Sequence, residues 1–61
     1  MRVTADTIRT AVESENASLC GKIAETLRFE YGMNYGKIWR TVSNVTGISQ
    51  ADWDQLLQES E

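Results

Sequence analysis

Histidine and proline are absent from the 61-residue chain, and cysteine occurs once, at position 20. Without histidine, the chain lacks the commonest general base of enzymes and a principal zinc ligand. A single cysteine excludes a disulfide within the chain and cannot build a closed zinc site. We therefore expect no enzyme activity, no cofactor, no metal and no small-molecule substrate.

Long apolar runs are also missing. The residues after Met1 show no apolar stretch of signal-peptide length, and no segment reaches the ~20 apolar residues of a membrane span. A lone cysteine is typical of a reducing compartment. These absences predict a cytoplasmic protein with no membrane partner, and the start at Met1 without a visible tag predicts a complete small gene product.

Residues 1–61 are expected to form one small helical domain, since a chain of this length buries only about 60% of its unfolded surface. Small folds often depend on disulfides, metals or self-association. With the first two excluded, the remaining options are tight helix packing, a homodimer or a partner protein.

The net charge of −3 is unevenly distributed. Residues 21–47 are mildly basic, whereas residues 48–61 carry acids and no base, namely Asp52, Asp54, Glu59 and Glu61. An ordinary solvated surface is the favoured interpretation of this pattern. The alternative is a basic face that the acidic tail partly masks.

Helix start and stop signals are unusually clear. Apolar residues recur at spacings of three and four, and capping side chains precede them at Thr4, at Asn16 or Ser18, at Asn34 and at Ser49. They predict an all-α fold, a compact bundle of four short helices over about 5–15, 18–31, 35–46 and 50–59, with tight Gly, Asn and Ser corners.

The boundary between the first two helices is the weakest. Residues 13–18 are polar but hold no Gly or Pro, and the apolar stripe continues across them in helical phase. Residues 5–31 could therefore form one helix of ~40 Å, which would favour a dimer. We favour a break near residues 16–18, because globular helices average about 11–12 residues.

The stretch "EYGMNYGK", residues 30–37, repeats Tyr-Gly. Gly32 fits the position after a helix end, Met33 would fold back onto Leu27, and Asn34 would cap the next helix. Gly36 has no such explanation. Close approach of a neighbouring helix is favoured there over an anionic ligand.

A helix-turn-helix that binds DNA is the alternative function. With Gly32 at the glycine of the motif's turn, Leu27, Tyr31, Met33 and Ile38 fall at its apolar positions, whereas Arg28 and Thr41 do not fit. The outward face of helix 35–46 would then contact nucleic acid through Lys37, Arg40, Thr41, Ser43 and Asn44. An acidic chain of pI about 4.7 argues against this function.

A protein-binding role is the favoured function. Two tryptophans, two tyrosines and a phenylalanine are many large rings for so small a core. Aromatic residues and Arg are enriched at protein interfaces. We predict an adaptor or inhibitor that binds another protein, or a second copy of itself, through Phe29, Tyr35, Trp39 and Arg40 near the corner between the second and third helices.

Overall fold

The computed structural model describes residues 1–60, which form four α-helices: α1 (Ala5–Glu13), α2 (Ala17–Phe29), α3 (Tyr35–Thr46) and α4 (Gln50–Glu59). The expected all-α bundle of four short helices is confirmed. The bounds of α3 and α4 are those expected, whereas α1 and α2 each end two residues earlier and α2 also begins one residue earlier. Glu61, the last acid of the tail, lies outside the described residues.

A side-chain oxygen caps the N-terminus of every helix. The four caps are Thr4, Asn16, Asn34 and Ser49, and each accepts a hydrogen bond of 2.9 to 3.2 Å from the backbone N–H three residues later. Such a cap contributes about 1 kcal/mol. Of the two candidates for the second helix, Asn16 is the cap and Ser18 is not.

The break between α1 and α2 is centred on Glu15, whose φ of 52° lies in the left-handed region. This backbone conformation is uncommon for a residue with a Cβ, and it ends α1 without a glycine. The N–H of Asn16 then donates to the carbonyl of Ala11 at 2.9 Å as the chain turns. The alternative of one continuous helix over residues 5–31 is therefore wrong.

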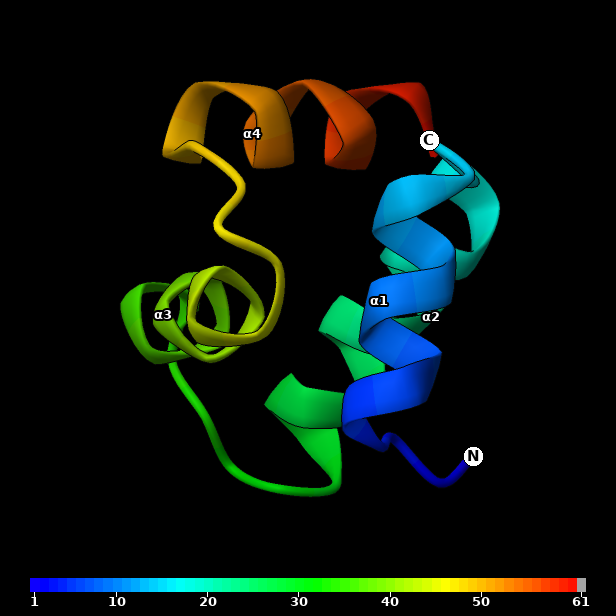
Figure 1. The fold of residues 1–61 in the computed structure, drawn as a ribbon. Helices are drawn as coiled ribbons and strands as arrows, with labels where there is room; N and C mark the ends of the chain where they lie inside the picture. Colours follow the sequence, from blue (N-terminus) through cyan, green and yellow to red (C-terminus); the bar gives the residue numbers. More distant parts are fainter. Residues whose placement is uncertain (61) are drawn as a thin grey trace.

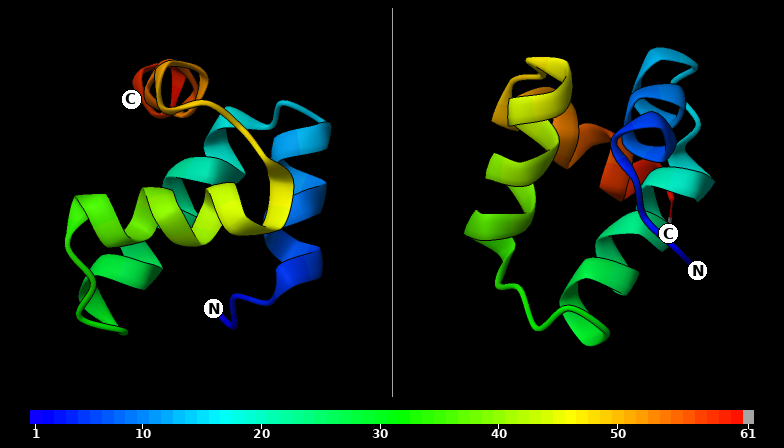
Figure 2. Two further views of the ribbon diagram at one scale, coloured as in Figure 1. Left: turned by 60° about the vertical axis from the view of Figure 1, so that its left-hand side comes forward. Right: turned by 60° about the horizontal axis from the view of Figure 1, so that its bottom comes forward.

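Helices α2 and α3 each contact all three other helices, and α2 makes the larger share of the contacts. Figure 1 shows α1 upright in front of α2, α4 across the top and α3 viewed end-on, and the two views of Figure 2 confirm these steep crossings. The apolar stripes of all four helices meet in one core, made of Ile8, Ala11, Cys20, Ile23, Leu27, Ile38, Val42, Trp53 and Leu56. Among residues 1–60, no helix is both long and apolar enough to cross a membrane.

Gly21 lets the end of α4 lie close against α2. A Cβ at this position would meet the Oγ of Ser60 at 2.7 Å and its Cβ at 2.9 Å. Both distances are too short for ordinary contact, so the Ser60 side chain would have to shift if residue 21 carried a Cβ.

The corner between α2 and α3 follows the sequence prediction in its first half. Gly32 has a φ of 69°, and the N–H of the half-buried Met33 donates to the carbonyl of Leu27 at 3.0 Å. Gly36 differs, since among residues 1–60, apart from the backbone of its own helix and its chain neighbours, the one atom within 4 Å of a Cβ built there is Oδ1 of Asn34, at 3.6 Å. The expectation that a neighbouring helix approaches Gly36 is therefore wrong.

These two glycines should respond in opposite ways to alanine. Gly32→Ala is expected to lower the free energy of unfolding by about 1 kcal/mol, because a Cβ disfavours positive φ. Gly36→Ala should raise it by up to about 0.5 kcal/mol, because the position is helical and has room for a methyl group. Urea unfolding of both variants measures the difference. A clear loss of stability in Gly36→Ala would contradict the open surroundings of that residue.

Candidate functional site

A groove of about 560 Å³ opens between α2 and α3, and Leu57 of α4 contributes to its lining. We call it the α2–α3 groove. Its apolar lining comes from three different helices, and its aromatic and polar residues come from α2 and the start of α3. The complete lining is Ala24, Glu25, Arg28, Phe29, Asn34, Tyr35, Ile38 and Leu57.

Phe29 is the most exposed large apolar side chain of the described residues, at 74%. It is the last residue of α2 and lies off the stripe that sends Ile23 and Leu27 into the core. Tyr35, which is 42% exposed, lies on the same groove from the α3 side. An exposed apolar surface beside a hollow is a common mark of an interaction site.

Two charged side chains of opposite sign flank this aromatic surface. The Cζ atom of Arg28 lies 5.4 Å from the centre of the Phe29 ring, within the range of a cation–π contact. Within residues 1–60, neither Glu25 nor Arg28 belongs to an ion pair; the pairs there join Asp6 to Arg9 and the amino terminus to Glu30. Both charges on the groove are therefore available to another molecule.

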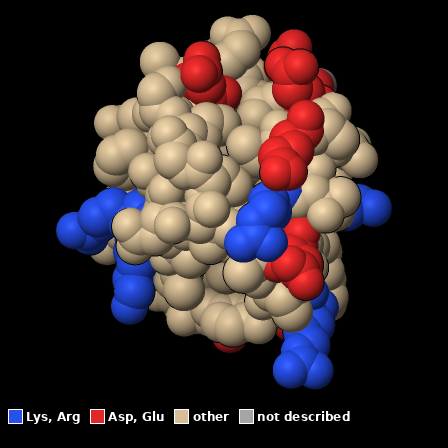
Figure 3. Space-filling model, viewed as in Figure 1, with Lys and Arg blue, Asp and Glu red and all other residues tan. Residues whose placement is uncertain are grey.

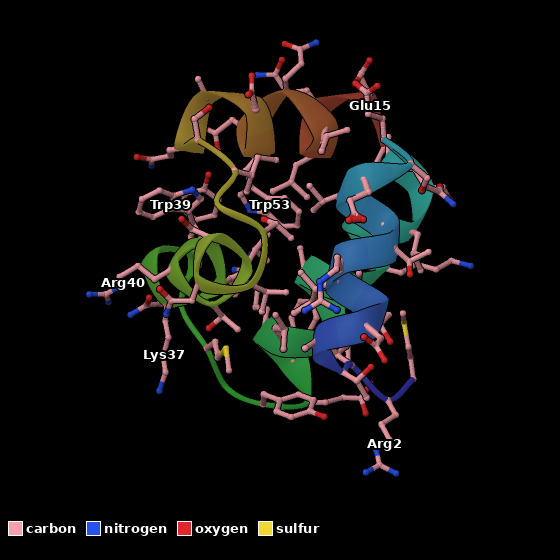
Figure 4. The ribbon with its side chains drawn as sticks, viewed as in Figure 1. Arg2, Glu15, Lys37, Trp39, Arg40 and Trp53 are labelled. Carbon is pink, nitrogen blue, oxygen red and sulfur yellow. The ribbon has the colours of Figure 1, made fainter. Side chains whose placement is uncertain are left out.

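The four predicted protein-binding residues fall into two pairs. Phe29 and Tyr35 line the α2–α3 groove, whereas Trp39 and Arg40 do not. Trp39 lies between α3 and α4, and Arg40 points away from the body of the protein (Figure 4). Trp39 packs against the core, and its indole N–H is buried with no hydrogen-bond partner among residues 1–60.

The sequence did not predict that Ala24 and Leu57 line the groove. Ala24 lies on α2 and Leu57 on α4, and neither is among the site residues predicted from the sequence. Their shared exposure beside Phe29 depends on how α4 lies across α2, a tertiary contact that spans more than 25 residues of sequence. Helical periodicity alone carries no information about that contact.

The predicted nucleic-acid face lies on the outer side of α3. Lys37, Arg40 and Asn44 are exposed, and Figure 4 shows the first two pointing into solvent. Thr41 and Ser43 are half-buried. The Thr41 hydroxyl donates to the carbonyl of Lys37 at 2.8 Å, so part of its hydrogen-bonding capacity is used within α3.

The corner between α2 and α3 matches the helix-turn-helix motif only in part. Leu27 and Ile38 are buried and Met33 is half-buried, but Tyr31 is 50% exposed. Residues 30–34 separate the two helices, which is longer than the three- to four-residue turn of that motif. Arg28, at the position where the motif's helices usually cross, lies exposed on the groove instead.

Charge is partly segregated over the surface. Figure 3 shows acidic side chains at the top and down the right-hand side, and basic ones at the left, at the right edge, at the lower end and among the acids of the right-hand side; Figure 4 places Glu15 near the top, Lys37 and Arg40 at the left and Arg2 at the lower end. A second hollow of about 340 Å³ lies at the acidic end, with Glu15, Asp52 and Glu59 among its lining residues. Within residues 1–60, no ion pair joins these acids to the bases of α3.

The one thiol is poorly placed for chemistry. Cys20 is fully buried in α2, and this burial raises the pKa of its thiol, so that less thiolate is present at neutral pH. The part of the chain that the structure describes contains no group of three or more His, Cys, Asp or Glu residues placed to hold a metal ion.

Comparisons with protein families, with curated proteins and with solved structures found no match to this chain.

Proposed function

We propose that this protein is a small non-enzymatic protein-binding module, an adaptor or inhibitor, that binds its partner through the α2–α3 groove. The observation that carries this proposal is the 74% exposure of Phe29 beside a groove with apolar lining. The other large apolar side chains of α2 are buried or half-buried. Phe29 is therefore not needed to complete the core.

The composition of the groove supports a protein partner. Burying an exposed phenylalanine contributes about 1.5–3 kcal/mol, which is the scale of a binding hot spot. Tyr35 adds a second ring with a hydrogen-bonding hydroxyl, and Arg28 adds a cation beside the Phe29 ring. Ala24, Ile38 and Leu57 provide a surface onto which an apolar side chain of the partner can pack.

Catalysis is not supported by the groove's chemistry. Its only carboxylate is Glu25, and its only cation is Arg28. The thiol of Cys20 lies in the core, away from this lining. A binding role uses what the groove offers, which is apolar area and two opposite charges.

Affinity capture from the native cell tests the proposal with a matched pair of variants. Phe29→Ser should lower recovery of the partner by about a hundredfold relative to the unmodified protein, because it removes the central anchor. Tyr31→Ser is the control, since Tyr31 is also an exposed ring near this corner but does not line the groove. It should retain the partner. Equal recovery by Phe29→Ser and the unmodified protein would contradict the proposal.

Nucleic-acid binding by α3 is the second candidate. It is supported by the exposure of Lys37, Arg40 and Asn44 on one helix face, with no ion pair among residues 1–60 to neutralise the two bases. Such binding would be strongly salt-dependent. Failure of the protein to shift duplex DNA at low salt would exclude it.

A further inference from the structure

The positions of the two charged residues in the groove allow one copy of the groove to pair with another. Glu25 and Arg28 are three residues apart on α2, both line the groove, and neither has an ion-pair partner among residues 1–60. The same groove also carries a protruding ring, Phe29, and a small residue, Ala24. The groove therefore carries one negative and one positive charge. It also carries one protruding side chain and one small residue that such a side chain can cover.

From this arrangement we infer that a second copy of the chain occupies the α2–α3 groove, forming a two-fold symmetric homodimer with antiparallel α2 helices. This inference rests on the proposed function, because it names an occupant of the same groove. In a two-fold interface, the same surface patch is used by both subunits and must complement itself. The α2–α3 groove meets that requirement.

A single position of the two-fold axis satisfies both kinds of contact. When the axis passes α2 at the level between Thr26 and Leu27, Glu25 of one copy faces Arg28 of the other, and the reverse pair forms by symmetry. The same axis places Phe29 opposite Ala24 of the second copy. Each Phe29 ring then covers the small residue in the other copy's groove, near Ile38 and Leu57.

Other positions of the axis are less favourable. An axis at the level of Glu25 would place the two Glu25 side chains opposite each other, and would place Lys22 opposite Arg28. Both are contacts between like charges, which oppose association. The charge order on α2 thus selects one antiparallel register over its neighbour.

The dimer has a consequence for partner binding. Because Phe29 of each copy is covered by the other, a partner protein that uses the same groove must displace the second copy. Self-association and partner binding are then mutually exclusive. The homodimer is a storage form whose population rises with protein concentration.

Charge reversal tests the inference by sedimentation between ~10 µM and ~1 mM, where the unmodified protein should show a concentration-dependent dimer. Glu25→Arg alone and Arg28→Glu alone should both be monomeric, because each places like charges across the interface. An equimolar mixture of these two variants should restore a dimer containing one copy of each. Phe29→Ser should weaken the association of the unmodified sequence by about a hundredfold, since symmetry removes two rings.

Matched controls lie outside the groove. Arg40→Glu and Glu59→Arg reverse exposed charges that do not line it, and each should dimerise like the unmodified protein. A monomeric unmodified protein across the whole range would overturn the inference, as would a mixture of the two groove variants that stays monomeric. If those results appear while capture of a different protein still requires Phe29, the homodimer is wrong and the proposed function stands. If the dimer forms as expected but Phe29→Ser captures every partner, the proposed function is wrong and the homodimer stands.

Discussion

Replacing Trp53 with alanine should remove a large part of the protein's stability at 25 °C. Trp53 is the largest fully buried side chain of the described residues, and α4 holds it in the core shared with Ile23 and Val42. Truncation of a buried tryptophan costs about 3–5 kcal/mol, while a domain of this length has a total stability of about 3–9 kcal/mol. Far-UV circular dichroism with a urea titration measures the loss.

Trp53→Phe is the matched control for this prediction. It retains most of the buried ring, and the indole N–H that it removes is buried without a hydrogen-bond partner among residues 1–60. No protein hydrogen bond is therefore lost, and we expect a cost of about 1–2 kcal/mol from the lost volume alone. A loss below about 1 kcal/mol in Trp53→Ala would contradict the place of Trp53 in the core.

Ile23→Ala should have the second-largest effect, about 3 kcal/mol of the free energy of unfolding. Ile23 is 1% exposed on α2, which packs against all three other helices. The cavity left by its side chain is therefore surrounded by elements that are fixed by several contacts and cannot easily close on it. Urea unfolding at low protein concentration, monitored by circular dichroism, gives the value.

Phe29→Ala provides a sharp control because it removes a larger apolar side chain from the same helix. At 74% exposure Phe29 contributes little to the core of a single copy, so its loss should change the free energy of unfolding by no more than about 0.5 kcal/mol. The comparison must be made below the concentration at which the protein self-associates. A cost for Phe29→Ala equal to that of Ile23→Ala would mean that Phe29 belongs to the core and is not an interaction surface.

The order and bounds of the helices could be predicted because their signals are local. A cap such as Asn34 acts on a backbone N–H three residues away, and Gly47 supplies positive φ directly after α3. The ends of α1 and α2 were each predicted two residues too late. The left-handed residue that separates α1 from α2 is Glu15, a residue type that rarely adopts this conformation, so α1 was expected to continue through it.

The groove could be predicted only in part, because it is a product of tertiary packing. Phe29 and Tyr35 were selected as large aromatic residues near the corner between the second and third helices, and both line it. Trp39 was selected by the same aromatic criterion, yet it packs against the core. Leu57 was not selected, since its exposure beside Phe29 depends on the path of α4 over α2. Gly21, where α4 ends against α2, is the sequence feature that marks this path.

The most direct test of the proposed binding surface is a nuclear magnetic resonance titration of the ¹⁵N-labelled protein with the protein that it captures. The account predicts that the largest amide shift changes fall on residues 24–29 and 34–38 and at Leu57. Residues of α1, which do not line the groove, should change little. Changes centred on α1 or on the outer face of α3, with Phe29 and its neighbours unaffected, would contradict the assignment of the α2–α3 groove as the binding site.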